Sequence, residues 1–243
     1  ADINGYEVPS AVSDCFSVPT HDLSIDLQSS PNLISFSVIP LNNSIDNVLS
    51  SLGDNMISLL GEGMSANNID GNWAGSLQTI SYEDGYWLIV NEASTLNLSG
   101  LLIPSSQLYT LNGGQNLISY PLTTCGAIAE VLPDGAQLYT DAITGEGVAA
   151  VSTENGWIGS LQSLCPNDGY WFLSQFPFPL EFTFNEPTSL ARKKVLTPSP
   201  YPYHQSTQQA FYFIESVENI EVGDWLLAYN GESVIGARQW TGT

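Results

Sequence analysis

The chain has very little positive charge. Its 243 residues include 4 lysines and arginines against 25 aspartates and glutamates, which gives a formal net charge of −21. A field of this sign repels phosphate backbones and anionic lipid, so it argues against nucleic acid or a membrane surface as a partner. The charge suits a saline or calcium-containing exterior, where ions screen self-repulsion over about 8 Å. An ordinary soluble acidic surface is the plainer interpretation.

Signatures of catalysis are equally scarce. The two histidines, His21 and His204, stand near opposite ends of the chain, and no GxSxG, HExxH or paired CxxC motif occurs. These are the patterns that place a nucleophile, a zinc ligand or a redox pair. We therefore predict a protein that is not an enzyme and needs no organic cofactor.

Long apolar runs are also missing. No stretch approaches the roughly 20 apolar residues of a membrane span. The chain begins with Ala1 rather than methionine and shows neither the charged nor the apolar part of a secretion signal. We expect either a removed signal or a piece of a longer protein, and we predict an extracellular location: secreted, on a cell surface or on a virion surface.

What the sequence does contain is one module written twice. Residues 61–90 and 145–174 lie 84 positions apart and are identical at 13 of 30 positions, and the same offset pairs residues 32–35 with 116–119. Self-similarity at a fixed offset indicates a duplicated structural unit. Two acidic positions recur in both copies: Glu62 corresponds to Glu146, and Asp84 to Asp168. A glycosidase needs two carboxylates facing each other across a cleft, and among 25 acidic residues some pair will always look suitable. Recurrence within a duplication, however, first indicates a structural need.

Each copy follows the pattern of a small β domain. A short leading strand (residues 23–27 or 108–111) precedes an apolar, β-branched run typical of a buried strand. An Asp-Gly pair near the end of each copy predicts a tight turn with positive φ angles, and an alternating strand closes the unit. We predict an all-β fold with two tandem homologous modules, each a small β-barrel or β-sandwich with one short helix.

The helix of each copy has expected boundaries. In the first copy Ser44 is placed to begin it and Gly53 to end it. In the second copy Thr124 is placed to begin it, and Pro133 forbids its continuation.

The last part of the chain has a different composition. Residues 208–217 and 224–240 predict three strands, the last two joined by Asn230-Gly231, a strong hairpin signal. Three strands make a thin, incomplete third β domain that would invite strand addition from a partner. The expected organisation is a lead segment (1–20), module one (21–103), module two (104–187), a Pro/Ser linker (188–203) and the partial domain (204–243).

The linker carries most of the scarce positive charge. Arg192, Lys193 and Lys194 form one basic run, followed by a stretch rich in proline and serine. An exposed connector is the plainer interpretation, and a processing or docking site is the alternative.

Three cysteines are present. Cys125 and Cys165 fall in the second copy, and the equivalent positions of the first copy hold Leu41 and Ser81. A bridge between them would add roughly 3–4 kcal/mol in the chain-entropy model; two small buried thiols are the alternative. Cys15 is left over, free or paired outside this chain.

The candidate ligand-binding residues are Trp73, Trp157 and Asp70. The two tryptophans recur beside polar loops, where an exposed indole can stack on a sugar ring, although a recurring tryptophan in a small module is commonly part of its core. The same argument assigns Trp87 and Trp171, which follow Asp-Gly in each copy, to the module cores. Asp70 lies in a loop resembling half of a calcium site, although the second copy lacks an equivalent loop.

The repeated motifs resemble a β-rich repeat of bacterial secreted and cell-surface proteins, with an NLIS strand, a GYW strand and a closing L-T-L-type strand. The matching residues are 32–35, 85–87 and 95–100 in copy one, and 116–119, 169–171 and 180–185 in copy two. Residues 204–240 are similar to a segment of marine bacterial surface proteins and marine phage virion structural proteins. Neither family is defined by a catalytic residue.

Together these observations predict a non-enzymatic structural or adhesive segment of an extracellular surface or virion appendage. Its partners would be other protein chains, bound by β-edge pairing or by self-assembly. The alternative is a set of carbohydrate-binding accessory modules of a secreted hydrolase.

Overall fold

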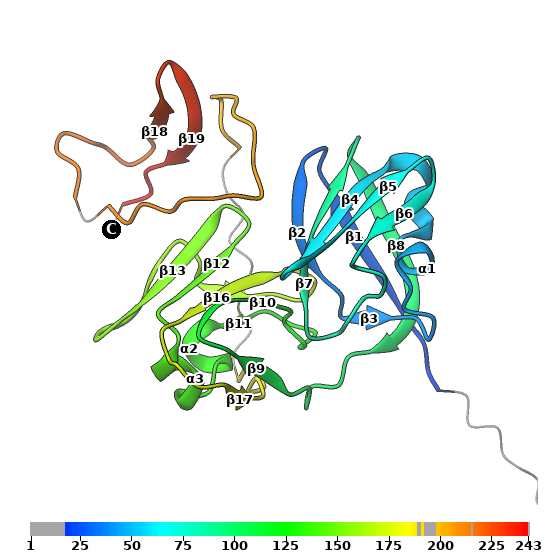
Figure 1. The fold of residues 1–243 in the computed structure, drawn as a ribbon. Coiled ribbons are helices and arrows are strands. Elements are labelled where there is room, and N and C mark those ends of the chain that lie inside the picture. Colours follow the sequence, from blue (N-terminus) through cyan, green and yellow to red (C-terminus); the bar gives the residue numbers. More distant parts are fainter. Residues whose placement is uncertain (1–17, 189–190, 192–197, 215, 243) are drawn as a thin grey trace, which may run out of the picture.

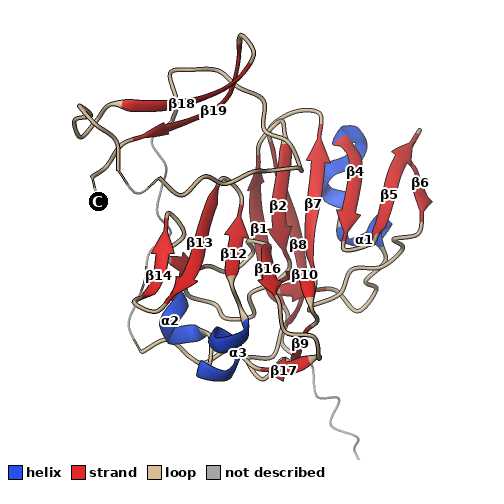
Figure 2. Cartoon of the chain, turned by 60° about the vertical axis from the view of Figure 1, so that its left-hand side comes forward, coloured by secondary structure: helices blue, strands red, loops and turns tan. Residues whose placement is uncertain are grey.

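The computed structural model describes residues 18–188, 191, 198–214 and 216–242. Two β-rich modules lie side by side, and a C-terminal hairpin stands apart from them (Figures 1 and 2). Most of the lead segment, with Cys15, and the basic run at 192–194 lie outside the described residues.

The first module is built from two antiparallel sheets. One has five strands in the order β2-β7-β4-β5-β6, and the other has three in the order β1-β8-β3. The elements are β1 (His21–Leu27), β2 (Pro31–Ser35), β3 (Val38–Ile39), α1 (Ile45–Val48), the 3₁₀ helix η1 (Ser50–Asn55), β4 (Met56–Gly61), β5 (Met64–Ile69), β6 (Asn72–Gly75), β7 (Gly85–Val90) and β8 (Ser94–Leu102).

The second module has a five-stranded sheet with the same connectivity, in the order β10-β16-β12-β13-β14. Two-stranded pairs β17-β9 and β11-β15 complete it. The elements are β9 (Tyr109–Leu111), β10 (Gly114–Ile118), β11 (Gly126–Ala127), α2 (Ile128–Val131), α3 (Asp134–Tyr139), β12 (Ala142–Gly145), β13 (Val148–Thr153), β14 (Gly156–Gly159), β15 (Ser163–Leu164), β16 (Tyr170–Ser174) and β17 (Leu180–Phe182).

Each module has its own apolar core, because alternate residues of its strands point inward. On β1, Leu23, Ile25 and Leu27 are buried between exposed neighbours. They pack with residues of both sheets and of α1 in one cluster, while a separate cluster containing Tyr109, Tyr120 and Phe172 forms the second core. The mostly antiparallel β architecture is therefore as predicted, although a closed barrel is not what these sheets describe.

The helical segments depart from the prediction of one short helix per copy. In the first module α1 follows Ser44 and is succeeded by η1, which contains Gly53 at φ 56°. In the second module Thr124 does not begin the helix, since α2 starts after Ala127. Pro133 then separates α2 from a further helix, α3, because proline fits before a first helical turn but not within a helix.

The described residues of the C-terminal region form a single hairpin of β18 (Trp225–Asn230) and β19 (Ser233–Gln239). The predicted hairpin is confirmed, but its turn consists of Gly231, at φ 62°, and Glu232, because Asn230 pairs with Ser233 at the end of β18. The strand predicted at 208–217 is wrong for its described residues, which form no strand. No helix in the described part of the chain has the length and apolar character that crossing a membrane would need.

Candidate functional site

The candidate site is the contact between the two modules, because segments far apart in the sequence meet there. On β2 and β7, Ile34 and Tyr86 face the first core, so Leu33 and Trp87, which pair across the strands, face the opposite way. They pack with Leu117 and the partly buried Trp171 of the second module. The prediction that Trp87 and Trp171 belong to separate module cores is wrong, since both lie in this shared cluster.

Four of the backbone N–H hydrogen bonds across this contact form two reciprocal pairs. The Leu33 N–H donates to Glu146 Oε2 over 2.9 Å, and the Leu117 N–H donates to Glu62 Oε2 over 2.8 Å. Leu33 and Leu117 are 84 positions apart, as are Glu62 and Glu146. The same group of one module therefore contacts the same group of the other, which is the arrangement of a two-fold, isologous interface. The recurrence of the two glutamates has this structural cause.

A second pair of reciprocal hydrogen bonds lies two residues further along the chain from Leu33 and Leu117. The Ser35 N–H donates to the Asn167 carbonyl, and the Ser119 N–H donates to the Glu83 carbonyl, each over 2.9 Å. Single β-bridges join Ile34 to Asp168 and Asp84 to Ile118 at the equivalent places. Strands β2 and β10 are thus each extended by backbone pairing with the other module. We call this whole contact the seam, formed by Leu33, Glu62, Gly85 and Trp87 with Leu117, Glu146, Gly169 and Trp171.

Two glycines allow the modules to approach. A Cβ on Gly85 would lie 2.8 Å from Leu117 Cδ1 and 3.2 Å from the Gly169 Cα. A Cβ on Gly169 would lie 2.7 Å from the Ile34 carbonyl oxygen. Neither glycine has a positive φ angle. The prediction that the Asp-Gly pairs supply positive φ to a tight turn is therefore wrong, and their glycines are required by close backbone contact instead.

The residues flanking these glycines form a further repeated arrangement. The Tyr86 hydroxyl donates to Asp84 Oδ2 over 3.4 Å and accepts the Ser81 N–H over 2.8 Å. Tyr170 makes the equivalent bonds to Asp168 and the Cys165 N–H, over 3.3 and 2.8 Å. Burial raises the pKa of Asp84, aided by nearby Glu83 and opposed by the bond from Tyr86. The arrangement fixes the loop that reaches across the seam.

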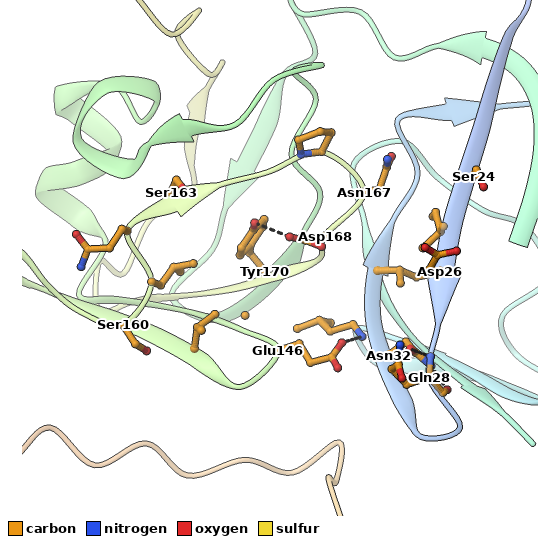
Figure 3. Close-up of a pocket in the computed structure, with 18 residues that line it drawn as sticks. Ser24, Asp26, Gln28, Asn32, Glu146, Ser160, Ser163, Asn167, Asp168 and Tyr170 are labelled. Atoms are coloured by element: carbon orange, nitrogen blue, oxygen red, sulfur yellow. Dashed lines mark hydrogen bonds between the residues drawn. The ribbon is translucent and has the colours of Figure 1, made fainter. Parts of the chain in front are cut away.

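A cavity of about 520 Å³ opens along one side of the seam (Figure 3). Its walls come from both modules: Asp26 and Gln28 approach from the first, and Glu146, Gln162 and Asp168 from the second. Apolar side chains complete the lining, namely Ile25, Leu33, Val148, Leu161 and Pro166. Clefts between domains that combine apolar walls with a few polar groups are common ligand sites.

The cavity breaks the two-fold relation between the modules. At least three of its lining residues have a bulkier residue 84 positions away, and two of those bulkier residues are bonded or packed within their modules. Tyr82 donates to the Leu101 carbonyl, and Tyr109 is buried in the second core. The three pairs, cavity residue first, are Ser24 with Leu108, Ile25 with Tyr109, and Pro166 with Tyr82. The side chains that line the cavity are therefore smaller at these three positions than the residues 84 positions away.

The ligand-binding residues predicted from the sequence, Trp73, Trp157 and Asp70, are not among the residues of the seam. Trp73 packs partly buried against the first core and Trp157 against the second, where its Nε1 donates to Gln137 Oε1 over 3.1 Å. Asp70, at φ 50°, and Gly71, at φ 81°, form the two-residue turn between β5 and β6. A two-residue turn with positive φ angles favours Asp and Gly, which explains why both occur here. Calcium binding at Asp70 stays a prediction. Within the described residues no three His, Cys, Asp or Glu side chains gather as a metal site would require.

Cys125 and Cys165 are joined by a disulfide in the second module, with a sequence separation of 40. The bridge connects the segment before β11 to the segment after β15. Both ends therefore belong to one module, and the bridge does not cross the seam.

Comparison with known proteins adds no relative to this description. No protein-family model, curated protein or solved structure matches the chain.

Proposed function

We propose that the chain is a non-enzymatic structural or adhesive segment of an extracellular surface or virion-appendage assembly. The observation that carries this proposal is the state of the β18–β19 hairpin. Neither strand has a further sheet partner among the described residues, and none of the hairpin's side chains is fully buried. A lone hairpin is only marginally stable in water, so its free edges favour pairing with another chain.

The two-module body supports the same proposal. We take the modules as two copies of one sandwich-like fold, held together by reciprocal contacts into a single block. Such a block is suited to spacing and display, and the net charge of −21 suits it to a saline exterior. The partners would be other protein chains, or further copies of this one, bound along the hairpin edge.

Substituting Ile235→Lys is expected to reduce chain-to-chain association at least several-fold. Ile235 lies on β19 with 52% of its surface exposed, and a lysine on an edge strand opposes pairing with a second strand. The measurement is sedimentation velocity over a concentration series, with and without candidate surface proteins. Leu138→Lys is the control, since Leu138 is 75% exposed on α3 and belongs to no strand. Equal association of both variants, or a wild-type chain that binds neither itself nor a partner, would remove the support for this function.

Carbohydrate binding is the second candidate, and the seam cavity favours it. Amide and carboxylate groups over apolar walls are the chemistry that recognises a polyhydroxylated ligand. Because Trp73 and Trp157 are committed to module packing, this proposal places the sugar in the cavity instead.

Gln162→Ala is expected to weaken glycan binding by about tenfold, because the substitution removes one to two hydrogen bonds to the ligand. Gln162 lines the cavity and donates to the Gly159 carbonyl over 2.6 Å. Gln78→Ala is a matched control, because Gln78 makes the same bond to Gly75 over 2.8 Å in the other module. A glycan array followed by calorimetry gives the comparison. Binding that both substitutions weaken equally, or no binding to any glycan, would count against the cavity.

A further inference from the structure

We infer that the seam is a self-complementary surface whose second partner is another copy of this chain, reached by exchange of modules. The proposal goes beyond the hairpin-edge function and uses a different surface. The reciprocal hydrogen bonds across the seam support this inference. Each module supplies the donor of one reciprocal bond and the acceptor of the other: the first has the Leu33 N–H and Glu62, and the second has the Leu117 N–H and Glu146.

The contacts of the seam can form equally between two modules of one chain and between modules of two chains. The apolar part consists of Leu33, Leu60, Trp87, Leu117 and Trp171, while the two large clusters stay inside their modules. Opening the seam therefore leaves both module cores intact. Module one of one chain can then meet module two of a second chain, and both seams re-form with the same bonds.

The connection between modules is placed to act as the hinge. Ile103 is 2% exposed and its N–H donates to the Ser37 carbonyl over 2.8 Å, so it anchors the first module. Tyr109, 1% exposed, anchors the second. Between them Pro104, Ser105 and Ser106 are exposed, and a turn is closed by the Gln107 N–H donating to the Pro104 carbonyl. Once the seam is open, exchange of modules requires this turn to straighten.

Concentration decides between the closed and exchanged forms. A short connection gives the two modules an effective concentration of about millimolar, so the closed monomer dominates in micromolar solution. Shortening the connection strains the closed form and leaves the exchanged dimer unstrained, which is how short hinge loops promote exchange.

The test is a loop-length series on the full chain, refolded from denaturant and measured by light scattering after size exclusion. Deleting Pro104 to Gln107 joins the two anchors through a single residue and is expected to convert most of the protein to twice the 26.2 kDa monomer mass. Inserting about ten Gly and Ser residues into the same turn is expected to leave a monomer.

Two further variants of the shortened chain identify the interface. Adding Glu62→Ala and Glu146→Ala removes both charge-assisted bonds and is expected to raise the dimer's dissociation constant at least tenfold. Adding Ile235→Lys should leave the dimer unchanged, which separates exchange from pairing at the hairpin edge. A shortened chain that stays monomeric overturns the proposal. So does a dimer that ignores the two glutamates or dissociates with Ile235→Lys.

Discussion

Replacing Gly85 or Gly169 by alanine is expected to destabilise the seam by about 1–3 kcal/mol for each substitution, the usual cost of overpacking. The added methyl of Gly85→Ala meets Leu117 and Gly169, and that of Gly169→Ala meets the Ile34 carbonyl and Leu33. Backbone atoms cannot move aside without lengthening the bridges of β2 and β10 to the opposite module. The double substitution is therefore expected to separate the modules while each retains its core.

Chemical denaturation followed by tryptophan fluorescence and far-ultraviolet circular dichroism measures this effect. Loss of seam burial around Trp87 and Trp171 should precede the loss of strand signal in the double variant. Gly135→Ala is the control: Gly135 lies in α3 with no atom within 4 Å of its added Cβ, so alanine should stabilise by up to about 1 kcal/mol. If the seam variants unfold like the control, close approach is not what the two glycines provide.

The chain is expected to unfold cooperatively when the pH rises above about 10. Tyr86, Tyr109, Tyr120 and Tyr170 are at most 2% exposed, and burial raises the pKa of each above its ordinary value. The unfolded chain therefore loses these protons first, and stability falls as the pH climbs past the unfolded pKa. Each tyrosine contributes about 1.4 kcal/mol per pH unit, so four contribute about 5–6. At that slope, a typical free energy of unfolding of about 5–15 kcal/mol falls to zero within one to three pH units.

A pH titration that records tyrosinate absorbance and circular dichroism together tests this expectation. The two signals should change in one transition for the buried tyrosines. Tyr120→Phe should move the midpoint upward, because the buried Tyr120 hydroxyl has no hydrogen-bond partner among the described residues and its loss removes a titrating group at little cost. Tyrosinate formation that proceeds gradually with the strand signal intact would contradict the account.

The strands could be predicted from the sequence more fully than the contact between the two modules. The apolar runs at 32–35 and 116–119 became β2 and β10, because β-branching and alternation are local signals. Thr124 failed as a helix start because a serine or threonine before an apolar run is common outside helices, and tertiary contacts placed α2 three residues later. The strand predicted at 208–217 had suitable residues but no partner among the described strands.

The seam was missed because its cause is not local. Leu33 and Glu146 are 113 positions apart, and no spacing rule connects them. One signal was available: β7 is apolar on both faces, with Tyr86, Trp87 and Leu88 all buried, whereas a strand with one solvent-facing side alternates. Recurring residues that the module cores do not need, such as Glu62 and Glu146, were the second signal.

Hydrogen exchange at the Leu33 and Leu117 amides tests the two-fold seam most directly. Both N–H groups donate to a glutamate of the opposite module, so their exchange is expected to be slow and similar in the native chain. In Gly85→Ala or Gly169→Ala both amides should be released together, while the amides of Leu88 and Phe172 in the module sheets stay protected. Fast exchange at either leucine in the native chain, or release of one without the other, would contradict the two-fold seam.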